Sequence, residues 1–195
     1  MNEGHIPPPC TRKPATAESP LEDLALTGLL PVGMIVTIRG ELSADELEAG
    51  DIVMVLARPG YSPVQRVVET MVDLTRRPDA APVLITEGAI DRLSPCRTTI
   101  LGPQSLIGVD DRLVAVADLL NGRSIRRLPA AGYVRYLQFE MGQHEMLIAD
   151  GLRVGSLSRG MALCWPQISD RADLDLLRAR ITDRIPALEA AGLLT

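Results

Sequence analysis

Residues 134–157 read VRYLQFEMGQHEMLIADGLRVGSL. Two runs of β-branched, aromatic and aliphatic residues, 132–139 and 145–149, stand on either side of a polar turn around Gly142. The second run ends at Asp150-Gly151, a dipeptide that readily adopts the positive φ angles of a two-residue hairpin turn. The stretch therefore predicts antiparallel strands joined by short loops.

The same pattern extends upstream as far as Met34. Runs with strand composition, separated by turn residues, occupy residues 34–38, 51–57, 63–74, 81–87 and 112–120. Asn121-Gly122 predicts a second hairpin turn. Between the first two runs, Ser43 and Glu46 have the spacing of a capping box, and Gly50 follows as a stop signal. We therefore expect an all-β fold that contains one short helical turn.

The two ends of the chain differ from this β-rich part. Residues 1–20 are rich in proline and lack periodicity, which predicts a flexible leader, so the β domain is expected to span 21–157. Residues 158–195 form the third part, a C-terminal helical tail. Its apolar residues recur at helical spacings, namely Leu174, Leu177, Ile181 and Leu188. Pro186 is expected to interrupt or restart that helix.

Composition argues against several classes of function. The net charge is −5, the isoelectric point is about 5.1, and only five residues are aromatic. Nucleic acid is therefore not an expected partner. No apolar run is long enough for a membrane span or a signal peptide. We expect no membrane association, and a protein that is cytoplasmic or exported without a cleavable N-terminal signal.

The cysteines and acidic residues do not indicate a metal or a cofactor. Cys10, Cys96 and Cys164 are far apart and none belongs to a Cys-x-x-Cys pair, so neither a disulfide framework nor a zinc site is expected. Isolated cysteines of this kind are usually small buried hydrophobic residues. The acidic stretches also lack the Asp-x-Asp spacing of a calcium loop.

Four sequence blocks in order resemble the bacterial Hedgehog/intein (Hint) domain family. VGMIVTIRGELSADELEAGDIVMV (32–55) resembles its opening strands and E-x-L-x-x-G-D link, and PVLITEGAI (82–90) resembles its A-G-A-L type turn. ADLLNGRSIRRL (117–128) is similar to its A-x-x-L-V-N-G-x-x-I hairpin. Residues 134–157 resemble its closing block, in which H-E, A-x-G and S follow in order. The resemblance spans residues 29–157 and implies a Hint-like β fold.

This resemblance implies self-processing chemistry, for which the matching positions lack the required side chains. The family uses a cysteine or serine at the first residue of the domain, which attacks the preceding carbonyl carbon. Here that position is Leu29, and a one-residue shift gives Gly28 or Leu30. None of the three carries a nucleophile.

The partner positions have changed as well. The family's Ser/Thr-x-x-His on a middle strand matches Gly102 and Ser105 in LGPQSLIG (101–108). A serine hydroxyl does not titrate near neutral pH, so it does not replace an imidazole. In the closing block, the family's histidine matches Gln138 and its aspartate matches Gly142. We therefore expect no catalytic residues.

His144 and Glu145 do match the family's H-E pair. A single histidine without a titratable partner is more often a hydrogen-bonded structural residue than a catalyst. We expect His144 to bond a neighbouring strand or loop, and Glu145 to pair with an arginine such as Arg153 across the hairpin.

The sequence thus favours a degenerate Hint domain that acts as a structural or binding module, with an unknown protein or small-molecule partner, and not as an enzyme. One alternative is an atypical self-cleaving or splicing Hint domain that performs an N–S acyl shift with a displaced cysteine. Cys10 and Cys96 are the candidates, and two arginines close to Cys96 could lower the pKa of its thiol. The other alternative is a β-barrel enzyme that acts on a small molecule in trans.

Overall fold

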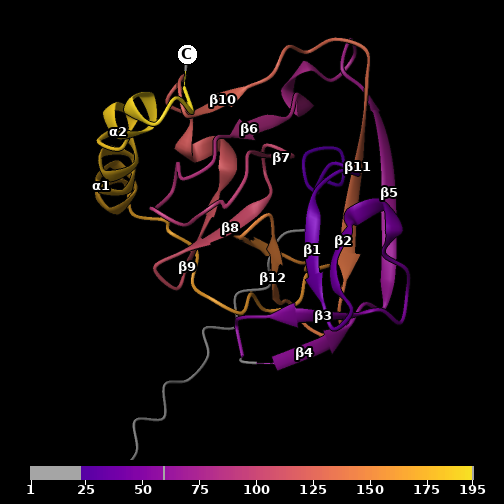
Figure 1. Ribbon diagram of the computed structural model, residues 1–195. Coiled ribbons are helices and arrows are strands. Elements are labelled where there is room, and N and C mark those ends of the chain that lie inside the picture. The colour runs from indigo at the N-terminus through magenta and orange to yellow at the C-terminus, as the bar shows by residue number, and fades with distance from the viewer. Residues whose placement is uncertain (1–22, 59, 195) are drawn as a thin grey trace, which may run out of the picture.

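The computed structural model describes residues 23–58 and 60–194 (Figure 1). Short strands make up most of this part of the chain, and two helices follow them. The first strands are β1 (Met34–Thr37), β2 (Gly40–Ser43), β3 (Ile52–Val55), β4 (Gly60–Pro63) and β5 (Arg66–Asp73). The middle strands are β6 (Val83–Ile85), β7 (Thr99–Leu101), β8 (Leu106–Val109), β9 (Arg112–Ala115) and β10 (Ile125–Arg127).

The last strands are β11 (Tyr133–Glu140), β12 (Met146–Ala149) and β13 (Leu152–Gly155). They are followed by α1 (Arg171–Thr182) and α2 (Ile185–Ala190), and short 3-10 turns are η1 (Ala44–Glu46), η2 (Pro78–Ala80) and η3 (Val116–Leu119). None of the helices within residues 23–194, Pro59 aside, is long and apolar enough to cross a bilayer.

Strand pairing brings the first and the last parts of the fold into one sheet. The largest sheet has the order β2-β1-β3-β12-β13-β8-β9, with β4 paired to β3. In it Ile35 lies opposite Ala149, and Leu147 lies opposite Val55. Two smaller sheets have the orders β10-β6-β7 and β11-β5. All these strand pairs are antiparallel, which confirms the all-β prediction.

The two dipeptide turn signals have different outcomes. Asp150 and Gly151 have φ angles of 51° and 73° and connect β12 to β13, so the predicted hairpin is confirmed. The prediction of a hairpin at Asn121-Gly122 was wrong. The segment before it forms the 3-10 turn η3, so Asn121-Gly122 connects η3 to β10, which pairs with β6. The Asn121 side-chain oxygen accepts hydrogen bonds from two backbone N–H groups of this turn.

The predicted capping box is present at η1. The Glu46 carboxylate accepts hydrogen bonds from the Ser43 backbone N–H at 3.0 Å and from the Ser43 hydroxyl at 2.7 Å. The prediction missed β2, which lies between β1 and η1. Its sequence, Gly-Glu-Leu-Ser, contains one large apolar residue and two exposed positions, so it has no run of strand-forming side chains.

The two C-terminal helices pack on the main hydrophobic core. Leu177, Ile181 and Leu188 are buried in that core, and Leu174 packs against it partly buried, so one helical stripe is covered as predicted. The helical conformation is interrupted between α1 and α2. Pro186 is the second residue of α2, where a missing N–H costs no hydrogen bond. Figure 1 shows both helices on the side of the molecule opposite β1, β2 and β5.

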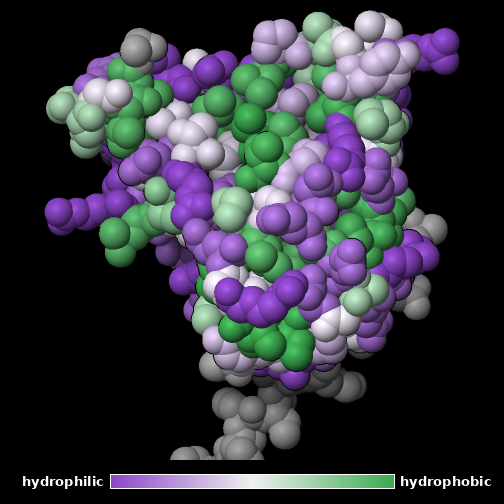
Figure 2. Space-filling view, turned by 45° about the vertical axis from the view of Figure 1, so that its right-hand side comes forward, coloured by the Kyte–Doolittle hydropathy of each residue, from purple (hydrophilic) through white to green (hydrophobic). Residues whose placement is uncertain are grey.

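Figure 2 shows the face on the β1–β5 side, where hydrophilic and hydrophobic side chains alternate over the surface.

Candidate functional site

The segment that enters the β domain, at Leu29, and the segment that follows its last strand, at Leu157, both bond to β11. Leu29 and Leu137 exchange two backbone hydrogen bonds, each 2.9 Å long. Two residues further along β11, the Leu157 N–H donates to the Phe139 carbonyl oxygen at 2.9 Å. The two ends of the β domain therefore lie close together on this strand.

Leu29 occupies the position where the resemblance places a nucleophile, and its side chain is part of the main core. It is 2% exposed. The preceding Gly28 has a φ of 118°, and a Cβ there would lie 2.8 Å from the Leu137 carbonyl oxygen. Only glycine fits this close approach with this backbone conformation.

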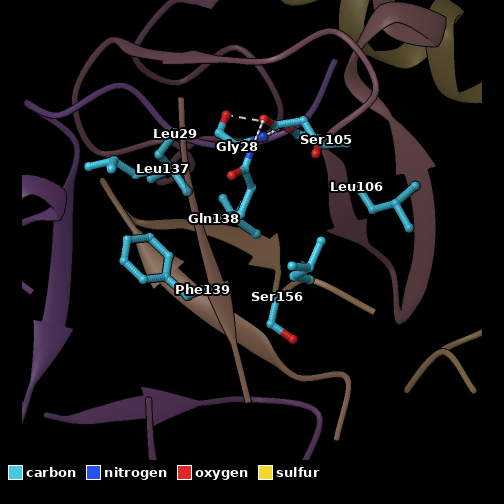
Figure 3. Close-up of a pocket in the computed structure, with 12 residues that line it drawn as sticks. Gly28, Leu29, Ser105, Leu106, Leu137, Gln138, Phe139 and Ser156 are labelled. Atoms are coloured by element: carbon cyan, nitrogen blue, oxygen red, sulfur yellow. Dashed lines mark hydrogen bonds between the residues drawn. The ribbon is translucent and has the colours of Figure 1, made fainter. Parts of the chain in front are cut away.

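The Ser105 side chain binds the backbone of Gly28 (Figure 3). Its hydroxyl oxygen accepts a hydrogen bond from the Gly28 N–H at 2.9 Å and donates to the Gly28 carbonyl oxygen at 3.2 Å. The Gly102 N–H also donates to that carbonyl oxygen, at 2.8 Å. We call the peptide bond between Gly28 and Leu29 the junction. Its carbonyl oxygen therefore accepts two hydrogen bonds, although Leu29 offers no attacking atom.

Gly102 is in close contact with the residues that precede the junction. A Cβ at this position would lie 2.6 Å from the Leu26 carbonyl oxygen and 2.9 Å from the Leu26 carbonyl carbon. The same oxygen accepts a hydrogen bond from the Gln104 N–H at 2.8 Å. Residues 24–28, which we call the incoming segment, thus fill the space that a side chain at position 102 would need.

Gln138, on β11, bonds the backbone of the incoming segment through its side chain. Its side-chain Nε2 donates to the Leu24 carbonyl oxygen at 2.8 Å and to the Thr27 carbonyl oxygen at 2.6 Å. Figure 3 shows this side chain pointing toward Gly28. We call Gly28, Gly102, Ser105 and Gln138 the junction cluster.

A small cavity of about 20 Å³ lies at the junction cluster. Gly28, Ser105, Gln138 and Ser156 are among its lining residues, and its size suits about one water molecule. Within the described residues, the buried atoms Thr27 Oγ1 and Gln138 Oε1 have no hydrogen-bond partner. Sequence reasoning did not single out Thr27, although its place two residues before Leu29 was a signal.

Gly142 lies in the loop between β11 and β12, away from the junction cavity. A Cβ there would meet only the end of the Gln65 side chain, at 3.3 Å. Position 142 therefore has room for a side chain, whereas position 102 does not.

His144 lies in the same loop, just before β12, and is 1% exposed. Its Nδ1 lies 3.1 Å from Cys164 Sγ and accepts a long hydrogen bond, 3.3 Å, from the Cys164 backbone N–H. This confirms that His144 bonds a neighbouring loop. Acceptance at Nδ1 assigns the ring proton to Nε2, which faces Gly155 and has no partner within the described residues.

Burial keeps both members of this pair neutral. It lowers the pKa of His144 to about 4, because a buried imidazolium loses its hydration. Burial, reinforced by the negative charge of Glu145, raises the pKa of the Cys164 thiol to about 11. The pair is therefore a thiol beside an imidazole at neutral pH, not a thiolate–imidazolium pair.

Glu145 pairs with an arginine, as predicted, but the partner is Arg58 and not Arg153. The buried Glu145 Oε1 accepts hydrogen bonds from Arg58 Nε at 2.7 Å and from Gln143 Nε2 at 2.9 Å. The hairpin register places Arg153 opposite Ile148, three residues further along the chain. Arg153 instead lies 3.4 Å from Asp111 Oδ1. His144, Glu145 and Cys164 together form what we call the His144 cluster.

The cysteines are less buried than expected. Cys96 is exposed and Cys164 is half-buried, so the expectation of buried small residues was wrong for both. Cys96 contacts Gly151 of the β12–β13 hairpin and does not line the junction cavity. Cys10 lies outside the described residues, as does the predicted leader. In residues 23–58 and 60–194, no group of three or more His, Cys, Asp and Glu side chains is arranged to hold a metal ion.

Several solved structures are similar to this chain. The solution structure of a bacterial intein-like domain from Clostridium thermocellum matches with a TM-score of 0.51 and 14% identity, over 67% of this chain and 97% of that domain. A DnaB intein from Synechocystis sp. PCC 6803 matches with a TM-score of 0.47 and 13% identity, over 67% and 98%. The gp41-1 intein matches with a TM-score of 0.45 and 14% identity, over 67% and 97%. At these identities the first match shows the fold alone.

No curated protein matches the chain in sequence. The sequence model of the Hint domain matches residues 28–161, which is more than half of the 195-residue chain. That match begins at Gly28, the residue held by Ser105, and it includes both clusters apart from Cys164. The chain therefore belongs to the Hint domain family.

Proposed function

We propose that this protein is a Hint domain that has lost self-processing and serves as a structural or binding module. The observation that supports this most directly is the state of the junction. The buried Leu29 stands where an attacking side chain is needed, and Ser105 is hydrogen-bonded to both polar backbone atoms of Gly28.

The chemistry of an acyl shift explains why these contacts do not suffice. The attacking sulfur or oxygen has to reach the carbonyl carbon of its own preceding peptide bond. Two donors at the Gly28 carbonyl oxygen would stabilise developing negative charge, which is one part of such a reaction. The nucleophile and a group that titrates near neutral pH are the missing parts.

The same contacts suit a holding function. Ser105 and Gln138 make four hydrogen bonds to the backbone of the incoming segment, each worth about 1 kcal/mol net. They fix the chain that precedes the domain onto β11. Because the junction cavity holds about one water molecule, a partner of this module would bind elsewhere on its surface.

Intact-mass measurement tests the loss of self-processing. Purified full-length protein is incubated with excess dithiothreitol or hydroxylamine, which cleave thioesters and esters. We expect one unchanged mass. A fragment that begins at residue 27, 28, 29 or 30 would overturn the proposal, and one that begins at Cys10 would support a displaced nucleophile.

Two variants make this experiment sharper. Cys10→Ser removes the displaced candidate, so a fragment that depends on Cys10 disappears in it. Leu29→Cys restores a thiol at the junction, and we expect it to stay intact because Ser105 supplies no imidazole. Cleavage of Leu29→Cys alone would show that the nucleophile was the only missing part.

A further inference from the structure

A cleft of about 470 Å³ opens beside His144, outside the junction cluster. Its lining residues include Cys164, Met161, His144 and Arg58. Cys164 and Met161 are both partly exposed and belong to the segment between β13 and α1. Two sulfur-containing residues and one histidine thus line one open space.

The state of His144 is unusual for a buried histidine. The lone pair of its Nδ1 is directed at the Cys164 thiol and at a backbone N–H that is 3.3 Å away, near the limit of a hydrogen bond. Glu145 Oε1 accepts from Arg58 and Gln143, and within the described residues its Oε2 has no hydrogen-bond partner, so the carboxylate does not bond the ring. Besides its contact with the Cys164 thiol, Nδ1 therefore accepts only one long hydrogen bond, and both His144 and Cys164 line the cleft.

We propose that His144 Nδ1, Cys164 Sγ and Met161 Sδ form a binding site for a soft monovalent metal ion, of the type of Cu(I) or Ag(I). Thiolate and thioether ligands select Cu(I), whereas a structural zinc ion takes four N, S or O ligands. The cluster contains one thiol, one imidazole and one thioether, which fits a low coordination number. This inference is independent of whether the domain processes itself.

Charge balance also favours a monovalent ion. One thiolate and one monovalent cation make a neutral site, so no net charge has to be buried in the half-covered cleft. A divalent ion would leave one positive charge there. The neighbouring carboxylate of Glu145 already pairs with Arg58 at 2.7 Å, so it is not available to neutralise that charge.

The geometry requires a small movement of the thiol. The Sγ–Nδ1 distance is 3.1 Å, and a metal bonded to both atoms at about 2.0–2.3 Å with an open angle needs about 3.6 Å. Cys164 lies in a loop and is half-buried, so a shift of about 0.5 Å is accessible. The long Cys164 N–H to Nδ1 hydrogen bond would be replaced by the metal–nitrogen bond.

Proton balance gives the proposal a distinctive signature. Binding breaks the Cys164 S–H bond, forms the metal–sulfur bond and releases one proton to the solvent. The imidazole releases none, because burial lowers the pKa of His144 to about 4. Arg58 and Glu145, the charged groups beside the pair, form an ion pair at 2.7 Å. The affinity should therefore rise about tenfold per pH unit between pH 6 and 8, which corresponds to one proton per ion.

The experiment uses the full chain with Cys10→Ser and Cys96→Ser, in which Cys164 is the only thiol. Cu(I) is supplied anaerobically as its bicinchoninate complex, and its transfer to the protein is followed by absorbance. We expect one ion per chain. Cys164→Ser should weaken binding at least about 100-fold, and Met161→Leu about tenfold, since each removes a direct ligand. Met54→Leu, on β3, is the matched control and should leave the affinity unchanged.

A second measurement identifies the nitrogen ligand without relying on a buried substitution. The ¹⁵N chemical shift of the His144 Nδ1 should change on addition of one equivalent of Ag(I), while the shifts of His5 stay constant. Absence of one-to-one binding, binding that survives Cys164→Ser, an unchanged affinity in Met161→Leu or an unaffected His144 ring would each overturn the proposed site.

Discussion

The junction cluster and the His144 cluster lie on the same β fold but differ in what fills them. At the junction, backbone atoms of the incoming segment have taken the space, and Ser105 and Gln138 bind peptide groups. At the His144 cluster, three titratable side chains pack together, and an open cleft lies beside them. The first cluster is thus built for holding a chain, and the second retains groups that can exchange protons or ligands.

Gly102 and Gly142 differ in the room that they leave for a side chain. At position 102 the incoming segment lies so close that even a Cβ would overlap the Leu26 carbonyl group. At position 142 only the flexible end of Gln65 is nearby. Position 102 is therefore closed to a side chain, and position 142 is open to one.

Removal of the C-terminal helices should have the largest effect and tests whether both clusters belong to one cooperative unit. Truncation after Ser169 deletes Leu177, Ile181 and Leu188 from the core, each worth about 1.5–3 kcal/mol. We expect the free energy of unfolding in urea to fall by about 4 kcal/mol or more, with apolar dye binding to the exposed surface. An unchanged melting temperature would mean that the helices are an independent element.

Gly102→Thr tests the closed junction position directly. The threonine Cβ would lie 2.6 Å from a backbone oxygen, so the incoming segment has to move, at a cost of about 3 kcal/mol. Gly142→Ala is the matched control, because its Cβ meets only one flexible side chain, and it should stay within about 0.5 kcal/mol of the wild type. Equal effects in the two variants, measured by urea unfolding, would contradict the distinction between closed and open positions.

His144 should make the protein less stable in mild acid. Its pKa of about 4 in the folded state lies below the ordinary value of 6.5, so between these values only the unfolded chain takes up the proton. Stability is then highest above pH 6.5 and falls as the pH drops toward 4. Between pH 7 and 5 we expect a loss of about 2 kcal/mol.

The matched variant for this pH effect is His144→Gln, which keeps a polar side chain and removes the titration. It should lower stability at pH 7 by about 1–2 kcal/mol, the range for a modest buried hydrogen bond. Its acid-side loss should be smaller than that of the wild type by the His144 contribution. Identical pH profiles for both proteins would show that the imidazole titrates normally.

Two serine variants, one in each cluster's hydrogen-bond network, should have the smallest effects on stability. Ser105→Ala removes both hydrogen bonds to Gly28, and Ser156→Ala removes the one that Ser156 Oγ accepts from the Glu145 N–H. We expect losses of about 1–2 kcal/mol and about 1 kcal/mol, respectively, from thermal unfolding. A neutral effect of Ser105→Ala would mean that water satisfies Gly28 and that the junction does not hold the chain tightly.

Local sequence signals predicted those elements whose determinants lie close together in the chain. Asp150-Gly151 set the β12–β13 hairpin, and the spacing of Ser43 and Glu46 set the cap of η1. Short strands such as β2 and β7 were missed, because strands of three or four residues gain their stability from paired neighbours and not from their own side chains.

The sequence by itself determined the family, the β architecture and the absence of a nucleophile at positions 28–30, because these depend on ordered motifs and on residue identity. Only the tertiary structure decided which side chains meet. It paired Glu145 with Arg58 and placed Cys164 against His144, contacts that join residues 87 and 20 positions apart. It also placed the incoming segment over Gly102. Such contacts follow from strand register and loop paths, and no local pattern in the chain encodes them.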